Sequence, residues 1–341
     1  MSRKGYEFTG GKVSVVTPVY NGEFHLAGML DSVLNQTYDK IDMILVDDGS
    51  TDGTVKVAET YREKFAERGY GFRVVEASHR CASGAINQGL PYVDGEFLIW
   101  PDSDDFLEPE SVEKRVSFLQ SHPQYECVRS LSYYFNAETG ELMERADEKT
   151  GDLSKEDLFW DILESKTFVC CGCYMLRAKS FFEIYPKRHI PEYNVGQNFQ
   201  MLLPFMYRHK CPTIQERLYG VYVREGSHSR RKLTEEEELR KYRNYEHLAD
   251  DIARICRIKD RASKKHILQW KARRRRQIAT KYDRKALLMS ALYQLYRCGD
   301  LEFRKMVKEL IAIGGGVKRN PNKNYKKKLR TNDDRNSRRK E

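Results

Sequence analysis

Residues 13–21 read VSVVTPVYN, a β-branched run that changes abruptly into proline, tyrosine and asparagine. Three further apolar runs follow. Between the run that begins at residue 13 and the next one, the apolar side chains repeat at a helical period. The runs are residues 41–46, 72–76 and 96–100, and the helical segment is 24–35. Strands that alternate with helices are typical of a doubly wound sheet. The predicted fold class is therefore α/β, with a mostly parallel central sheet flanked by helices.

Three of these four runs end directly in polar motifs. The motifs are TPVYN at residues 17–21, DDGS at 47–50 and PDSDD at 101–105. Ligands of doubly wound sheets bind in the crevice at the carboxyl ends of the strands. We therefore expect the three motifs to line one ligand site.

The third motif places Asp102, Asp104 and Asp105 within four positions. Like charges this close raise one another's pKa unless a cation shares them. Carboxylate oxygens suit Mg²⁺ or Mn²⁺, which usually complete their coordination with substrate phosphates and water. The alternative is an acidic turn that caps a helix beginning near Glu108. The second acidic turn, at residues 47–48, favours a nucleotide site with Mn²⁺ or Mg²⁺.

The basic charge of the chain belongs to its C-terminal tail. The 341 residues carry 60 Lys and Arg against 50 Asp and Glu, and the last 24 residues hold 11 of the former against 3 of the latter. Because this segment has almost no apolar side chains, we expect it to be disordered. It is either a solubilising tail or a segment that contacts anionic lipid or nucleic acid.

The sequence also excludes several classes of protein. No apolar run approaches the roughly 18 residues of a transmembrane helix, and no secretory signal opens the chain. The 8 cysteines are interpreted as free thiols of a cytoplasmic protein. The cluster CCGC at residues 170–173 lacks the second ligand pair of a structural zinc site, which favours small residues lining an acceptor site.

The three polar motifs, in this order and spacing, resemble family 2 glycosyltransferases of the GT-A fold, a Rossmann-like fold. Residues 85–89, AINQG, resemble the A-x-N-x-G helix of that family. The resemblance is firm over residues 12–107 and extends to about 228. It implies a metal-dependent enzyme that transfers a sugar, with inversion, from a nucleoside-diphosphate sugar to a hydroxyl group. The expected donor is a UDP-sugar, and the expected acceptor is a glycan or a lipid-linked molecule.

The resemblance also implies which residues bind the donor. Asp48 would accept a hydrogen bond from the base, and Arg80 would face the base or the phosphates. Ser103 would lie with Asp102 against the nucleotide. The base and ribose site would be lined by residues of the first motif, namely Thr17, Pro18, Val19, Tyr20 and Asn21.

The resemblance also implies that a divalent cation binds at this site. Asp102 would contact both ribose and metal, and Asp104 would be a direct metal ligand. Asp105 could share this role. His228 is either a further ligand to the metal or the diphosphate, or a surface histidine in a loop.

One departure from the family pattern concerns the general base, which inverting members need to deprotonate the acceptor hydroxyl. The family has a Glu-Asp-type pair at the start of a helix, where this chain has Gln197 and Asn198. Neither amide accepts a proton at neutral pH. Either Glu192 is the base, or the amides hold the acceptor while another group takes its proton, or the protein binds donor without transfer. We predict Glu192, with both amides facing the acceptor.

The remaining chain is predicted to be mixed up to about residue 225, with a strand at 214–223, and helical beyond 234. The predicted regions are a GT-A domain at 1–228, a helical region at 229–316 and the basic tail at 317–341. The helical region could form a homodimer interface, an acceptor clamp or a membrane contact.

Two other functions stay open beside the glycosyltransferase. One is a donor-binding regulator without activity, and the other is an RNA-binding protein that uses the tail and the basic run at residues 271–276. The chain has no recognised nucleic-acid module, so nucleic acid is not the expected partner. The expected setting is bacterial surface-polysaccharide synthesis in the cytoplasm, with peripheral contact at the inner membrane face through the tail.

Overall fold

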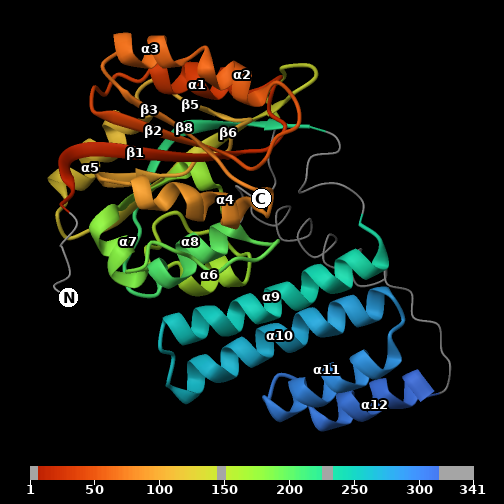
Figure 1. The fold of residues 1–341 in the computed structure, drawn as a ribbon. Coiled ribbons are helices and arrows are strands. Elements are labelled where there is room, and N and C mark those ends of the chain that lie inside the picture. The colour runs from red at the N-terminus through yellow and green to blue at the C-terminus, as the bar shows by residue number, and fades with distance from the viewer. Residues whose placement is uncertain (1–6, 144–150, 225–232, 315–341) are drawn as a thin grey trace, which may run out of the picture. The chain divides into compact units, whose positions relative to one another are not determined.

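The computed structural model describes residues 7–143, 151–224 and 233–314, whose strands form one sheet in the order β3-β2-β1-β4-β7-β6-β8-β5 (Figure 1). The chain divides into two units, 1–232 with 250–256, and 233–249 with 257–341. The strands are β1 (Thr9–Val19), β2 (Ile41–Asp47), β3 (Gly71–Glu76), β4 (Gly95–Ile99), β5 (Phe106–Leu107), β6 (Cys127–Asn136), β7 (Tyr174–Arg177) and β8 (Thr213–Val223).

Helices cover both faces of this sheet, with α1, α2 and α3 on one face and α4, α7 and α8 on the other (Figure 1). The helices of the first unit are α1 (Leu26–Leu34), α2 (Thr54–Glu59), α3 (Arg62–Glu67), α4 (Ala82–Gly89), α5 (Ser111–Ser121), α6 (Phe159–Leu163), α7 (Ala178–Ile184) and α8 (Gln197–Met206), with short 3-10 turns η1 (Leu90–Tyr92) and η3 (Cys171–Cys173).

The central strands are buried on both faces, which is why they read as continuous apolar runs. Met43, Ile44, Leu45 and Val46 of β2 are all fully buried. The strands predicted from such runs are confirmed as β1, β2, β3, β4 and β8.

The sheet is mixed beyond β4. Strands β1 to β4 pair in parallel, whereas β7 pairs antiparallel with both β4 and β6, and β5 pairs antiparallel with β8. Neither β6 nor β7 was predicted as a strand from the sequence. β7 has only four residues, too few for a clear period-2 pattern.

The strand register brings the ends of the parallel strands to one edge of the sheet. Val19 at the end of β1 pairs with Asp47 at the end of β2, and Asp47 pairs with Glu76 of β3. β4 ends at Ile99, just before the third polar motif. The three motifs therefore lie along the same edge, as the α/β prediction requires.

The second unit is helical. It contains α9 (Glu235–Ile255) up to Ala249, together with α10 (Arg261–Lys281), α11 (Lys285–Arg297) and α12 (Phe303–Gly314). A capping box begins α9, because the Thr234 amide donates to Glu237 Oε2 at 2.9 Å and the Glu237 amide donates to Thr234 Oγ1 at 3.3 Å. Helices α10, α11 and α12 share an apolar core that includes Ala279, Leu292 and Met306. No helix among the described residues is long and apolar enough to cross a membrane.

The basic run of α10 is engaged within the second unit. Arg273 pairs with Asp300, Arg275 pairs with Glu246 at 2.7 Å, and Arg276 pairs with Glu309 at 2.7 Å. These pairs leave the run poorly placed to bind phosphates, and they remove one of the two features behind the RNA-binding hypothesis. The other feature, the tail at 317–341, lies outside the described residues.

Candidate active site

The loops after β1 and β2 are held together by hydrogen bonds through Asn21. Its backbone N–H donates to Ser50 Oγ at 2.9 Å, and its Oδ1 accepts from the Thr51 N–H at 2.9 Å. Asn21 has a left-handed φ of 51°, a conformation that asparagine tolerates better than most residues. The first two polar motifs therefore form one structure.

Asp48 lies in this structure as a buried carboxylate. Its Oδ1 accepts from the Arg80 N–H at 3.1 Å, and its Oδ2 lies 3.1 Å from Nδ1 of His79. Burial raises the pKa of Asp48, although the Arg80 N–H and His79 counteract this rise. Both partners come from the segment after β3, so the ends of β2 and β3 meet at this carboxylate.

An aromatic pair flanks Asp48. The rings of Tyr20 and His79 stack with centroids 4.1 Å apart, and Tyr20 is 46% exposed. Gly49 lies behind them with a φ of 73°, and a Cβ on it would lie 3.0 Å from the backbone N of His79. Only glycine meets both demands without strain, so Gly49 lets the His79 segment approach Asp48 closely.

Several buried polar atoms at this edge have no partner in the described part of the chain. They are Thr17 Oγ1, Asp47 Oδ1 and Gln197 Oε1. Buried polar atoms in folded proteins are nearly always hydrogen-bonded to protein, water or ligand. Thr17 and Asp47 lie near the ends of β1 and β2, and Gln197 begins α8 beside the motif after β4. Together these atoms indicate a site for a polar ligand. The side chain of Pro18 is half-buried and that of Val19 is buried beside them.

The acidic motif after β4 is anchored by Tyr219 of β8. The Asp102 N–H donates to Tyr219 Oη at 3.1 Å, and Tyr219 Oη donates to Asp105 Oδ2 at 2.8 Å. The Tyr222 N–H donates to the other oxygen, Asp105 Oδ1, at 3.1 Å. Asp105 is buried and both its oxygens are engaged, so this geometry favours a positioning role for it over a ligand role.

Asp102 and Asp104 are the more accessible carboxylates of the motif, with Ser103 between them. Burial and the nearby charge of Asp104 raise the pKa of Asp102 to about 6, whereas hydrogen bonds from Cys171 and Gln197 act in the opposite direction. Asp104 Oδ2 lies 3.7 Å from Nη1 of Arg224.

Helix α8 presents its two N-terminal amides to this motif. Gln197 Nε2 donates to Asp102 Oδ1 at 3.3 Å, and the indole N–H of Trp100 donates to Asn198 Oδ1 at 3.2 Å. The two amides predicted to stand in place of the family's Glu-Asp-type pair therefore begin a helix and lie beside the acidic motif and Trp100.

Glu192 lies with the α4 residue Asn87 and with Arg80 rather than with the acidic motif. Its Oε1 accepts from Asn87 Nδ2 at 3.1 Å, and its Oε2 is 3.6 Å from Arg80 Nη1. His189 Nε2 is 3.7 Å from the same carboxylate. Asn87 also bonds the backbone N–H and carbonyl of Ile190, which fixes the segment that carries Glu192.

The cysteine cluster packs against the acidic motif. The Cys171 thiol hydrogen-bonds to Asp102, and burial raises the pKa of that thiol well above its usual range. A Cβ on Gly172 would come within 2.0 Å of the Tyr219 ring, so only glycine lets this ring pack there. Among the described residues, no group of three or more His, Cys, Asp or Glu side chains could hold a metal ion.

His79, Tyr219 and His25 lie at this edge but are not among the residues predicted from the sequence. Tyr219 lies within the predicted strand, but nothing in the sequence marks its hydroxyl as an anchor. The pKa of His25 is lowered mainly by burial and also by Arg224, while Asp104 acts against both, which places His25 near the acidic motif. Only its position a few residues after the first motif could have indicated it. The predicted ligand His228 lies outside the described residues.

Comparison with known proteins identifies the class of enzyme. Residues 14–185 match the model of glycosyl transferase family 2. The chain belongs to this family. EpsE of Bacillus subtilis (strain 168), which is named as a putative glycosyltransferase, is 27% identical over 230 residues, or 66% of this chain and 78% of EpsE. The chain spans 28% to 47% of the length of further curated glycosyltransferases that it matches.

Two solved structures share the fold of this family 2 glycosyltransferase. Staphylococcus aureus TarS 1-349 in complex with UDP-GlcNAc has a TM-score of 0.60 and 19% identity, covering 84% of this chain and 81% of that chain. The mannosyltransferase PcManGT from Pyrobaculum calidifontis, in complex with GDP-Man and Mn²⁺, has a TM-score of 0.54 and 17% identity, covering 95% and 86%. The predicted GT-A fold and glycosyltransferase class are thus confirmed.

The acidic motif fits a divalent cation that is bound together with a donor. Two partly exposed carboxylates, Asp102 and Asp104, supply hard oxygen ligands. Burial, and to a smaller extent the charge of Asp104, raises the pKa of Asp102, and a cation bound beside both carboxylates would favour their charged forms. Since protein ligands alone are too few in the described part of the chain, diphosphate oxygens and water would complete the coordination.

Proposed function

We propose that this glycosyltransferase takes a nucleoside-diphosphate sugar, a UDP-sugar in particular, and transfers the sugar with inversion to a hydroxyl of a glycan or lipid-linked acceptor. The observation that carries the proposal is the set of orphaned polar atoms at Thr17, Asp47 and Gln197, at the edge of the sheet that also holds the buried carboxylate of Asp48. Such a site has unmet hydrogen-bonding capacity where a nucleotide sugar would lie.

The nucleotide would be recognised between the first two motifs. Asp48 would accept from the N–H of the base, because each of its oxygens has a lone pair beyond those facing Arg80 and His79. Tyr20 would stack on the base from its exposed position. Thr17 Oγ1 would hydrogen-bond to the base or the ribose. The neighbouring residues Pro18, Val19 and Asn21 would line the same site.

The diphosphate would lie over the acidic motif, with Asp102 and Asp104 holding Mn²⁺ or Mg²⁺. When bound, the cation neutralises charge that develops on the nucleoside diphosphate as the sugar–phosphate bond breaks. Asp102 would also reach the ribose, and Ser103 would line the nucleotide. Tyr219 and Asp105 would fix the backbone of the motif. His228 remains a proposed further ligand, whereas the predicted ligand role of Asp105 is the less favoured one because both its oxygens are engaged.

The acceptor hydroxyl needs a general base, and we assign this role to Glu192. Its carboxylate is oriented by Asn87 Nδ2. Gln197 and Asn198 would hold the acceptor near the sugar, since Gln197 retains an unpartnered Oε1. The alternative, in which another group takes the proton, is supported by the 3.6 Å pairing of Glu192 with Arg80, because one oxygen of the carboxylate already faces a cation.

The regional organisation belongs to the same proposal. It comprises a GT-A domain at residues 1–228, a helical region at 229–316 and a basic tail at 317–341. We propose a role in surface-polysaccharide synthesis at the cytoplasmic face of a bacterial membrane. The relatedness to EpsE supports a bacterial glycosyltransferase only at the level of its family.

The decisive experiment is a calorimetric titration of the full chain with UDP, GDP and TDP, with and without Mn²⁺. We expect UDP to bind only in the presence of metal. Asp104→Asn should abolish this binding, because the substitution removes the ligand charge while it preserves the shape of the side chain. The matched control is Asp39→Asn, because Asp39 is an exposed aspartate just before β2, at the amino end of that strand.

The titration separates the alternatives. Failure of all three nucleotides with metal present would contradict the donor site. If UDP binds but no acceptor from a panel of glycans and lipid-linked sugars is glycosylated, the chain is a donor-binding regulator. Binding that is equally strong without metal would contradict the cation role of Asp102 and Asp104 while leaving the nucleotide site intact.

A further inference from the structure

Helix α12 has an apolar surface that is wider than its contact with the core. Met306 and Ile313 are buried in the core that α12 shares with α10 and α11, and Val307 packs against the edge of that core. Beyond this edge Phe303 and Ile311 are 57% and 69% exposed. An amphipathic helix that packs on a single core needs an apolar surface only where it meets that core. The exposed part of the apolar surface therefore requires a separate explanation.

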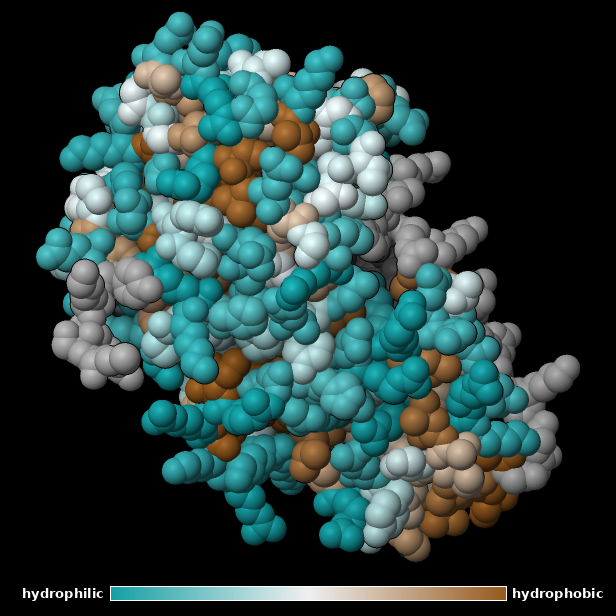
Figure 2. All heavy atoms as spheres, viewed as in Figure 1, coloured by the Kyte–Doolittle hydropathy of each residue, from teal (hydrophilic) through white to brown (hydrophobic). Residues whose placement is uncertain are grey.

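The exposed face forms a continuous stripe. Phe303, Val307 and Ile311 follow one another at intervals of four residues, which places them along one side of the helix. The Tyr296 ring of α11 extends the stripe, with its centroid 5.6 Å from that of Phe303. Figure 2 shows hydrophobic residues gathered at the surface over α12. We call Tyr296, Phe303, Val307 and Ile311 the apolar stripe.

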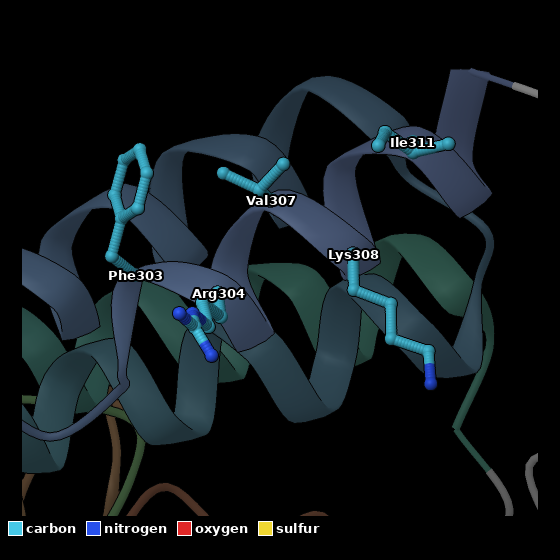
Figure 3. Close-up of a pocket in the computed structure, with 5 residues that line it drawn as sticks. All are labelled: Phe303, Arg304, Val307, Lys308 and Ile311. Atoms are coloured by element: carbon cyan, nitrogen blue, oxygen red, sulfur yellow. The ribbon is translucent and has the colours of Figure 1, made fainter.

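Basic side chains border the apolar stripe. Arg304 and Lys308 line the same shallow groove of about 330 Å³ as Phe303, Val307 and Ile311, and Figure 3 shows the two basic side chains directed away from the apolar ones. Neither has an ion pair within the described residues. The acidic residues of this segment are already paired, since Glu309 pairs with Arg276 and Glu302 with Lys305.

We propose that the apolar stripe docks into the surface of an anionic lipid bilayer. A helix with Phe and Ile on one face and Lys and Arg beside it is the pattern of helices that lie in the membrane interface. The aromatic ring of Tyr296 suits the headgroup level, where an apolar ring and a polar hydroxyl are both accommodated. Arg304 and Lys308 would contact lipid phosphates.

The sequence beyond α12 favours the same partner. Four residues after Gly314 begins the segment 318–341, with 11 Lys and Arg against 3 Asp and Glu. Cationic residues attract an anionic membrane surface by about 1 kcal/mol each when close to it. Membrane binding needs both apolar and cationic side chains. The apolar stripe on α12 and the cationic segment 318–341 follow one another along the chain.

A second copy of the chain is the weaker candidate for this surface. In a two-fold contact through the apolar stripe, Arg304 and Lys308 of both copies would border the same interface. Like charges at such an interface oppose association. Anionic headgroups provide the complementary charge that a second stripe lacks.

Vesicle flotation of the full chain tests the proposal. Vesicles of phosphatidylcholine alone are compared with vesicles in which about a quarter of the lipid is phosphatidylglycerol. We expect binding to the anionic vesicles only. The double substitution Phe303→Ser with Ile311→Ser should weaken it by roughly tenfold for each side chain. Arg304→Gln with Lys308→Gln should reduce the salt dependence of binding.

The matched control is Leu268→Ser on α10, which removes a side chain that is 42% exposed and lies outside the apolar stripe. A second readout is the Phe303→Trp variant with brominated lipids, which quench an indole only when it enters the bilayer. Equal binding of the double variant and the wild type would show that the tail alone acts, and would overturn the proposal. A dimer that the double variant dissociates, without vesicle binding, would identify a second copy instead.

Discussion

The Tyr219 hydroxyl donates to Oδ2 of Asp105 at 2.8 Å and thereby ties the acidic motif after β4 to strand β8. The hydroxyl oxygen of Tyr219 also accepts the N–H of Asp102 at 3.1 Å. One buried hydroxyl thus positions the backbone of the proposed metal ligands through contacts with Asp102 and Asp105. Removal of this hydroxyl would disturb the position of the motif while leaving its carboxylates in place.

Tyr219→Phe should lower the free energy of unfolding by about 1–3 kcal/mol, because it leaves a buried carboxylate short of one donor. It should also weaken metal-dependent UDP binding, since the Asp102 backbone loses its anchor. Urea unfolding and calorimetry measure the two effects. Tyr222→Phe is the control, because only the backbone N–H of Tyr222 contacts Asp105. Unchanged UDP affinity in Tyr219→Phe would contradict the positioning role.

Gly172→Ala should destabilise the protein by about 1–3 kcal/mol, because the new methyl group would overlap the Tyr219 ring. Gly28→Ala is the contrasting case, since Gly28 lies within α1 and a Cβ added there would have no atom within 4 Å. There alanine should stabilise by up to about 1 kcal/mol through helix propensity. Thermal unfolding of both variants tests the pair, and similar effects at the two sites would contradict the packing argument.

Glu192→Gln should lower the rate of sugar transfer by roughly 10²–10⁴-fold if Glu192 is the general base. The substituted amide can still accept from Asn87, so UDP affinity should stay close to that of the wild type. Transfer kinetics and nucleotide titration are compared on the same preparation. A normal transfer rate would move the search to another base, and a parallel loss of UDP binding would indicate a structural role.

Tyr20→Ala should weaken UDP binding by roughly tenfold, because it removes the aromatic surface proposed to stack on the base. The side chain is half-exposed, so stability should change little. Tyr92→Ala, which removes another tyrosine that is 42% exposed, is the control. Calorimetric titration with UDP in the presence of Mn²⁺ distinguishes them, and equal affinities would contradict the stacking role.

The first half of the fold could be predicted because buried parallel strands leave a clear pattern in the sequence. Residues 41–46 are almost all apolar and are followed by Asp47 and Asp48. Both the buried strand and the ligand site at its carboxyl end can therefore be predicted from the sequence. The antiparallel half lacks this signal. β6 carries the buried polar residues Arg129, Ser130 and Ser132, which interrupt any apolar run.

The site could be predicted in its residues but not in its connections. The sequence marks Asp48 and Asp102 through their motifs, whereas no pattern links Gln197 to Asp102 across 95 positions of the chain. The proposed base illustrates the same limit. Glu192 and Gln197 are close in sequence, yet they contact different partners, since Glu192 bonds Asn87 of α4 and Gln197 bonds the acidic motif. The different partners of Glu192 and Gln197 follow from tertiary packing, which the sequence pattern does not show.

The two hydrogen bonds of Asn21 have a consequence for the heat of donor binding. They hold the loops after β1 and β2 together through contacts within the protein. A nucleotide would therefore bind to a site that is already formed. A preformed polar site orders little chain on binding. We therefore expect UDP association to have a favourable enthalpy, a modest entropic penalty and a heat-capacity change far smaller than that of coupled folding and binding.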